Sequence, residues 1–348
     1  MRPRTSRSLH FVGSIPADGA EEAMRSMLSW GGPYVRSVTD GEVGDQGRWI
    51  ADLVNGFAEH PDLTLVSKGE WSNYRDIPRF RVRRGHRLDA GHLDFRRDTD
   101  ALAALPVFRA LRAESRRDDL SFQVGIPGDL DLALFTFGPL GALRHRAVFR
   151  QVLAREIRHV HAEAGDDVIF QIEMPAELIV MCRTPRPLCG IMAVLLARGV
   201  TKLIRQTLTG TRFGLHLCLG DLNHESLGKP RTTRPLVQIA NALARQWPPG
   251  RPLEYLHAPL TGGADPVPAE PAYYTPLRDL HLHPRTRFIA GLVQETSTTA
   301  RLRHALELTE TAYGEPVDIA AGCGLARRTP EAAAANAELS RMLCEDAP

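Results

Sequence analysis

Short apolar runs alternate with segments of helical periodicity along most of the chain. Eight runs rich in β-branched and aromatic residues are predicted to be strands: Leu9–Gly13, Tyr34–Thr39, Phe122–Ile126, Val168–Ile172, Phe213–Cys218, Leu253–His257, Phe288–Val293 and Val317–Ala321. Helical patterns lie between them, among others at residues 46–60, 147–164, 177–198, 235–246 and 298–313. Near-continuous apolar strands that alternate with helices are typical of a parallel sheet covered by helices. Eight of them predict an α/β protein with a single (β/α)₈ TIM barrel over residues 1–348.

Two long insertions interrupt this pattern, after the second and the sixth predicted strand. Residues 65–105 are polar and rich in arginine, and they include Trp71 and Tyr74. Residues 258–283 are rich in proline and glycine. Long irregular segments in a compact domain usually cover or line a site, so we expect a lid-like first insertion and a long active-site loop in the second.

Composition excludes several classes of partner. The 43 Lys and Arg residues nearly balance the 41 Asp and Glu residues, and a net charge of +2 predicts neither a nucleic-acid partner nor a membrane surface. We expect no apolar run to approach the roughly 18–20 residues needed to span a bilayer, and the basic residues 1–7 lack the apolar core of a signal peptide. We therefore expect a cytoplasmic protein whose five cysteines are reduced, which favours metal binding or catalysis over disulfides.

Two short motifs carry the most specific chemistry. His216 and Cys218 stand two apart at the end of a predicted strand, so their side chains point to the same side. Cys323 lies between two glycines, directly after the last predicted strand. An imidazole and two thiolates suit Zn²⁺, and three protein ligands leave one position open. The alternative is a buried apolar cysteine beside a hydrogen-bonded histidine.

A fourth metal ligand is less clearly indicated. His257 lies at the C-terminal end of its predicted strand and is the better candidate. Glu254, three residues earlier, would point to the opposite side, toward the helices, where it would need a cation such as Arg251. Both alternatives remain open on the sequence.

Further polar residues follow the ends of predicted strands, at Ser14, Glu42, Glu173 and Glu295. Glu173 is either an active-site acid or the partner of a structural arginine, and Glu42 is otherwise a carboxylate that stabilises a helix start. Asp221 is a candidate to orient a metal-bound histidine, or it caps the next turn.

Two further groups have simpler interpretations. Cys182, Cys189 and Cys344 have no histidine nearby and are predicted to be structural. The pairs Arg83-Arg84 and Arg327-Arg328 are interpreted as solvated arginines, although such clusters also bind carboxylates or phosphates.

Taken in order, five motifs of this chain resemble the catalytic barrel of cobalamin-independent methionine synthase. They are Val12-Gly13-Ser14-Ile15-Pro16, Asp40-Gly41-Glu42, Gln171-Ile172-Glu173-Met174-Pro175, His216-Leu217-Cys218 and Cys323-Gly324-Leu325. The resemblance covers most of the chain and is strongest to the single-barrel, mostly uncharacterised relatives within the superfamily that also contains uroporphyrinogen decarboxylase. In the family, zinc binds one histidine, two cysteines and a glutamate and holds the homocysteine thiolate.

Carried over residue by residue, the resemblance implies that His216, Cys218 and Cys323 bind Zn²⁺. The family's glutamate falls on His257. Ser14, Glu42 and Glu173 fall on positions that contact the amino-acid part of homocysteine. Glu173 departs from the usual aspartate, and the 65–105 insertion has no counterpart that we can place.

The resemblance implies zinc-dependent methyl or alkyl transfer to a small-molecule thiol. The donor would be a methylated folate, a methylated corrinoid protein or another electrophile. Two alternatives remain: a metal-free enzyme similar to uroporphyrinogen decarboxylase, with arginines near residues 79–84 binding an acidic substrate, or a binding protein with a structural zinc.

Overall fold

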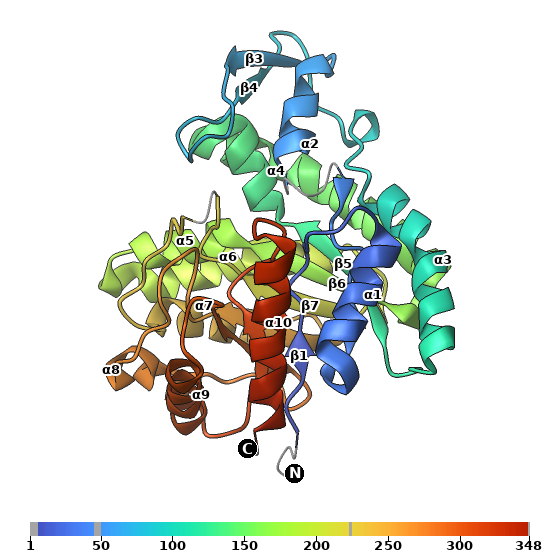
Figure 1. Ribbon diagram of the computed structural model, residues 1–348. Coiled ribbons are helices and arrows are strands. Elements are labelled where there is room, and N and C mark those ends of the chain that lie inside the picture. Colours follow the sequence, from blue (N-terminus) through green and yellow to red (C-terminus); the bar gives the residue numbers. More distant parts are fainter. Residues whose placement is uncertain (1–5, 45–49, 223–224, 347–348) are drawn as a thin grey trace.

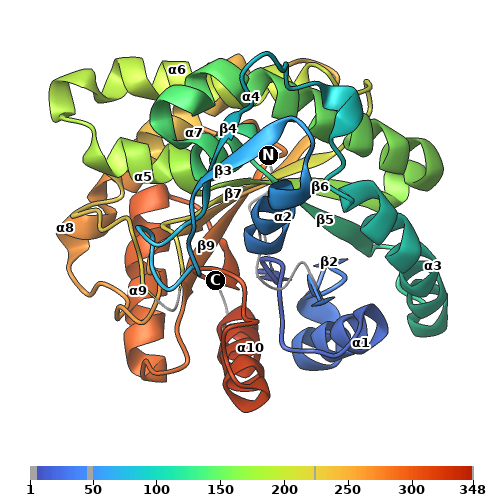
Figure 2. The same ribbon diagram turned by 90° about the horizontal axis from the view of Figure 1, so that it is seen from above.

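The computed structural model describes residues 6–44, 50–222 and 225–346 of the chain. Eight of the described strands form one sheet of parallel neighbours, in the order β1-β10-β9-β8-β7-β6-β5-β2. Their bounds are β1 Leu9–His10, β2 Ser37–Val38, β5 Ser121–Pro127, β6 Val168–Met174, β7 Phe213–Leu217, β8 Leu253–Pro259, β9 Arg287–Val293 and β10 Asp318–Ala321. A parallel bridge from Leu9 to Val35 lies at the seam between β1 and the segment before β2. The predicted TIM barrel is confirmed, and all eight predicted strands belong to it (Figures 1 and 2).

Helices surround the sheet, as the apolar strands predict. Every residue of β6 and β7 is buried, because the barrel interior covers one face and helices cover the other. The helices are α1 Ala20–Gly31, α2 Ala51–Gly56, α3 Arg97–Ser115, α4 Asp129–Ala164, α5 Pro175–Arg183, α6 Cys189–Ile204, α7 Arg234–Gln246, α8 Pro271–Tyr274, α9 Thr299–Tyr313 and α10 Pro330–Glu345.

Prolines explain two differences from the predicted helices. The single helix predicted over residues 177–198 is wrong, because Pro185 and Pro187 separate α5 from α6. The helix predicted from residue 147 begins 18 residues earlier, at Asp129. The helix is kinked at Gly138, which has a φ of 69° and precedes Pro139. Because of this kink, the helical pattern of residues 129–137 could not be recognised in the sequence. Part of the helix predicted over residues 46–60 lies outside the described residues, and α2 accounts for the rest together with a short 3₁₀ turn.

The first insertion forms a small unit beyond one end of the barrel (Figure 1). Strands β3 Leu63–Ser67 and β4 Arg79–Val82 pair antiparallel. The Arg79 side chain connects this hairpin to α4, because it donates hydrogen bonds to the carbonyls of Leu134 and Phe135. The predicted end of the insertion at residue 105 is too late, since residues 97–105 already belong to α3. A lid role for this segment stays a prediction.

The second insertion follows β8 and contains α8 and a 3₁₀ turn. Tyr273 and Tyr274 are buried in it, and the Tyr274 hydroxyl donates to the Pro268 carbonyl. The Thr233 amide and hydroxyl, at the start of α7, donate to the Tyr273 carbonyl and so attach the segment to the barrel.

One described segment, residues 186–204, is long and apolar enough to cross a membrane. This corrects the expectation that no apolar run reaches that length. Half of its most apolar stretch is buried, and its helix α6 packs against α4 and α7. Core helices pass the same test, so the segment is weak evidence for a membrane.

Candidate functional site

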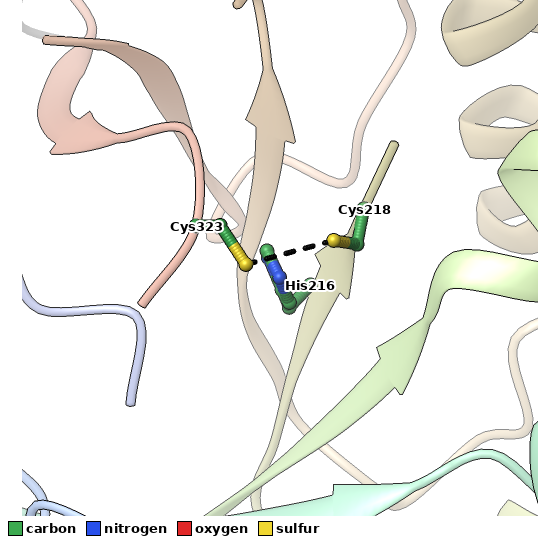
Figure 3. Close-up of side chains that lie close together, drawn as sticks. All are labelled: His216, Cys218 and Cys323. Atoms are coloured by element: carbon green, nitrogen blue, oxygen red, sulfur yellow. Dashed lines mark hydrogen bonds between the residues drawn. The ribbon is translucent and has the colours of Figure 1, made fainter. Parts of the chain in front are cut away.

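Three predicted ligands meet at the carboxyl ends of the barrel strands. His216 lies on β7, Cys218 follows the end of that strand, and Cys323 follows β10 (Figure 3). One potential ligand atom from each of the three lies within 4.8 Å of the other two. The barrel thus joins two motifs that are more than a hundred residues apart in the chain, as the sequence predicted.

His257 lies beside this cluster and orients it. Its Nε2 is 2.9 Å from the carbonyl oxygen of Ala321, which can only accept, so Nε2 carries the proton. Burial keeps both imidazoles neutral, since it lowers the pKa of His257 to about 4 and that of His216 well below its ordinary value. The unprotonated Nδ1 of His257 then accepts from the Nδ1–H of His216 at 2.7 Å. In this tautomer Nε2 of His216 carries a lone pair, and an imidazole with an unprotonated nitrogen is the form that binds a metal.

The two thiols form a hydrogen-bonded pair. Their sulfur atoms are 3.7 Å apart, and the Gly220 amide donates to the Cys218 sulfur at 3.3 Å. The hydrogen bond between the thiols lowers the pKa of Cys323 and, together with burial, raises that of Cys218. The two thiols therefore titrate as a pair, and after the first proton is lost the remaining proton can be shared between the two sulfur atoms.

Glu42 and Glu173 lie close together at the same end of the barrel. A Cβ atom built at Gly125 would lie 2.8 Å from Oε1 of Glu42 and 3.4 Å from Oε1 of Glu173. A Cβ atom at Gly13 would lie 2.3 Å from the same Glu42 oxygen, so a side chain at either position would displace the Glu42 carboxyl group. Burial, and next the charge of Glu173, raise the pKa of Glu42 well above its ordinary value. Two adjacent acids, of which Glu173 is buried and Glu42 half-buried, would be stabilised by a cationic ligand group.

Glu42 also has an unusual backbone conformation, with a φ of 49°. Left-handed geometry is uncommon outside glycine and recurs at functional sites.

Ser14 contacts the loop that carries Cys323. The Leu325 amide donates to the Ser14 carbonyl at 2.6 Å, and a Cβ atom at Gly324 would lie 2.3 Å from the Ser14 hydroxyl.

Other predicted candidates are placed elsewhere. Glu254 is not part of the cluster, because it pairs with Arg212 at 2.9 Å, three residues before His257 on β8. The cation that we expected beside an outward-facing Glu254 is therefore Arg212 and not Arg251. As a ligand, His257 stays a prediction, and binding would require one of its two hydrogen bonds to break.

Asp221 and Glu295 both pair with arginines of the last motif. Asp221 lies 3.5 Å from Arg327, and Glu295 lies 2.8 Å from Arg328. The interpretation of these two arginines as solvated is wrong, since the side chain of Arg328 is only 5% exposed and that of Arg327 29%.

Tyr74 is a residue beside the site that the sequence analysis did not assign to it. Its hydroxyl accepts a hydrogen bond from the Leu222 amide at 3.0 Å, and it lies against Gly220. The charges of Cys218 and Cys323 affect its pKa, which burial raises above its ordinary value. The insertion therefore places the Tyr74 hydroxyl against the loop that follows Cys218. An aromatic residue in a long insertion was the only signal for this in the sequence.

The fold and the cluster define a TIM barrel with a His/Cys site at the carboxyl ends of its strands. Solved structures of similar fold include a B12-independent methionine synthase from Shewanella sp. W3-18-1 in complex with selenomethionine, with a TM-score of 0.58 and 13% identity, over 98% of this chain and 96% of that one. Another is a putative vitamin-B12 independent methionine synthase from Listeria monocytogenes, with a TM-score of 0.53 and 13% identity, over 94% of this chain and 85% of that one.

At this identity the likeness shows a shared fold. The high coverage of those chains agrees with the resemblance to single-barrel relatives. No family model matches the chain, and no curated protein matches it.

Proposed function

We propose that the protein transfers a methyl or alkyl group to a small-molecule thiol at a zinc site made by His216, Cys218 and Cys323. The observation that carries this proposal is the three-donor cluster at the carboxyl ends of the strands, the face on which TIM barrels hold their active sites. Two solved structures of the same fold are methionine synthases, one of them putative, and this supports the same class of reaction.

The donor set fits zinc. One neutral imidazole and two thiols, of which Cys323 is the readier to ionise, are ligands that Zn²⁺ prefers over Mg²⁺ or Ca²⁺. Bound zinc would hold the substrate sulfur as a thiolate at neutral pH and so supply the nucleophile. Three protein donors favour a catalytic over a structural ion, because one coordination position remains for the substrate.

The acidic pair gives the proposal a preferred substrate class. Glu42 and Glu173 would bind the ammonium group of an amino-acid thiol, which offsets the cost of burying two acids side by side. Ser14, between this pair and the Cys323 loop, would contact the same part of the substrate. A homocysteine-like thiol satisfies both requirements. The alkyl donor is a folate, a corrinoid protein or another electrophile.

The first test is the metal content of reduced protein, measured by plasma mass spectrometry. We expect near-stoichiometric zinc in the wild type, loss of zinc in Cys218→Ala, and retention in Cys182→Ala, a matched control on α5. Wild-type protein without zinc would exclude the proposed site and favour the metal-free decarboxylase-like alternative.

A second measurement separates catalytic from structural zinc. Cobalt-substituted protein is titrated with homocysteine and its visible spectrum is recorded. A change in the ligand-field bands means that the thiol enters the coordination sphere, whereas an unchanged spectrum supports a closed, structural ion.

A further inference from the structure

A second concave site lies in the first insertion, outside the metal-ligand cluster. The segment from Phe80 to Leu88 faces residues 137–148 of α4, and together they line an open cavity of about 770 Å³. None of the proposed metal ligands lines it. The residues that do are concentrated in the arginine-rich stretch that the sequence singled out.

Positive charge dominates this cavity. Five arginines line it, at positions 81, 83, 84, 87 and 144, whereas no Asp or Glu is among the described lining residues. The side chains of Arg81, Arg84, Arg87 and Arg144 make no ion pair or hydrogen bond with any described residue. Arg83 donates to the Leu63 carbonyl through Nε only, which leaves its two terminal nitrogens available. Guanidinium groups gathered around one cavity repel one another, and a bound anion would relieve that repulsion.

Aromatic residues line both sides of the cavity and are held in place. Phe137 stacks on Phe149 at 5.7 Å, and Phe80 meets Phe57 edge-on at 6.2 Å. His145 lies against Phe137 at 4.9 Å, and burial together with Arg144 lowers its pKa. The Arg79 hydrogen bonds to α4 connect the two walls, so both sides of the cavity are anchored. A wall of this kind suits the apolar part of a ligand whose charged groups meet the arginines.

We propose that this cavity binds a small polyanion that carries at least two carboxylate or phosphate groups next to an apolar portion. Arginine is suited to both groups, because its planar fork makes paired, charge-assisted hydrogen bonds. A concave site of this volume has the size of a small-molecule site. The overall charge of +2 gives no support to a polymeric nucleic acid. The proposal is independent of the proposed function, since the two sites share no residue.

The test is calorimetric titration of the zinc-loaded, full-length protein with inorganic pyrophosphate and, separately, with tricarballylate. We expect at least one of them to bind at one site per chain. Binding should weaken at least about tenfold in Arg84→Gln/Arg144→Gln and also on addition of salt. Arg245→Gln/Arg285→Gln is the matched control, because it removes the same charge from exposed positions outside the cavity and should bind like the wild type. Arg81→Gln/Arg87→Gln is a second cavity variant in case the first folds poorly.

The outcomes are distinct. Binding of pyrophosphate alone identifies a phosphate ligand, and binding of tricarballylate alone identifies a polycarboxylate. The proposal fails if neither probe binds, if the cavity variants bind as tightly as the control, or if only a single-stranded oligonucleotide binds at these arginines. Zinc content measured on the same samples shows whether the metal-ligand cluster is intact, so failure here is distinguishable from failure of the proposed function.

Discussion

At the scale of single residues, the chain of hydrogen bonds from Ala321 through His257 to His216 determines what the metal-ligand cluster offers. The carbonyl of Ala321 sets the tautomer of His257, and His257 in turn sets that of His216. Asp221 was a candidate for this orienting role, but the group that accepts the hydrogen bond of His216 is His257 on β8. His257 thus has an orienting role that does not require it to bind the metal.

Replacing His257 tests whether it orients or binds the metal. An orienting partner contributes about 10–100-fold to metal affinity. We therefore expect His257→Ala to keep zinc at saturation but to bind it about 10–100-fold more weakly than the wild type in chelator competition. His283→Ala is the control, because His283 bonds to the Ala244 carbonyl away from the cluster. Complete loss of zinc, as in Cys218→Ala, would instead make His257 a ligand.

At the scale of elements, the kink in α4 and the first insertion depend on each other. Pro139 has no N–H, so the Phe135 carbonyl lacks its helical partner, and Gly138 takes a left-handed φ. The guanidinium of Arg79 donates to that carbonyl at 2.9 Å and also to the Leu134 carbonyl. A cation thus caps the C-terminal end of the first half of the helix, where the helix dipole favours positive charge.

We predict that Arg79→Ala weakens the attachment of the hairpin to the barrel. Hydrogen bonds from a charged donor contribute about 1.5–3 kcal/mol each, so the loss of both should lower the free energy of unfolding by at least about 3 kcal/mol in urea titration. Limited proteolysis between residues 63 and 92 should also become faster. Arg81→Ala is the matched control on the same strand, and equal effects of the two substitutions would contradict the capping role.

Strand β7 requires a glycine in its interior for a steric reason. A Cβ atom at Gly214 would lie 2.1 Å from the ring of Tyr255, whose hydroxyl donates to Gln171 inside the barrel. Gly214→Ala should therefore lower the free energy of unfolding by about 1–3 kcal/mol in urea, as overpacked cores do. Gly190→Ala, on α6 with nothing within 4 Å of the added methyl group, should cause no loss. A stable Gly214→Ala protein would mean that Tyr255 can move aside.

At the scale of the whole molecule, Glu156 connects α4 of the barrel to residues 95–97, which join the first insertion to α3. Its carboxyl group, on α4, accepts hydrogen bonds from the Phe95 and Arg97 amides at the start of α3. Burial raises its pKa to about 7, and nearby Asp98 and Asp94 add to the effect. The group therefore titrates in the neutral range, whereas an exposed glutamate does not.

This shift predicts a pH dependence of stability. An acid whose pKa is raised in the folded state binds its proton more tightly there, so its contribution is full below its ordinary pKa of 4.5 and is lost as the pH rises through about 7. Between pH 5 and pH 8, the free energy of unfolding of the wild type should fall by about 2 kcal/mol more than that of Glu156→Gln. Glu338→Gln, at an exposed position on α10, should follow the wild type. Parallel curves for all three proteins would refute the assignment.

The sequence by itself determined the barrel and the three ligands of the proposed metal site. A parallel strand buried on both faces must be almost wholly apolar, so each strand is a short apolar run that can be recognised locally. Polar residues directly after such runs meet at one end of any barrel. His216, Cys218 and Cys323 could therefore be grouped without knowledge of the structure.

Only the tertiary structure decided the remaining contacts. These contacts depend on distances between segments far apart in the chain. Examples are the pairs His257 with His216, Glu254 with Arg212, and Tyr74 with the Leu222 amide. Hydrophobic periodicity reports which face of an element is buried, but not which polar group of another element lies opposite it. The same limit applies to the five cavity arginines. All of them are exposed, and only the packing of residues 80–88 against α4 brings them to one cavity.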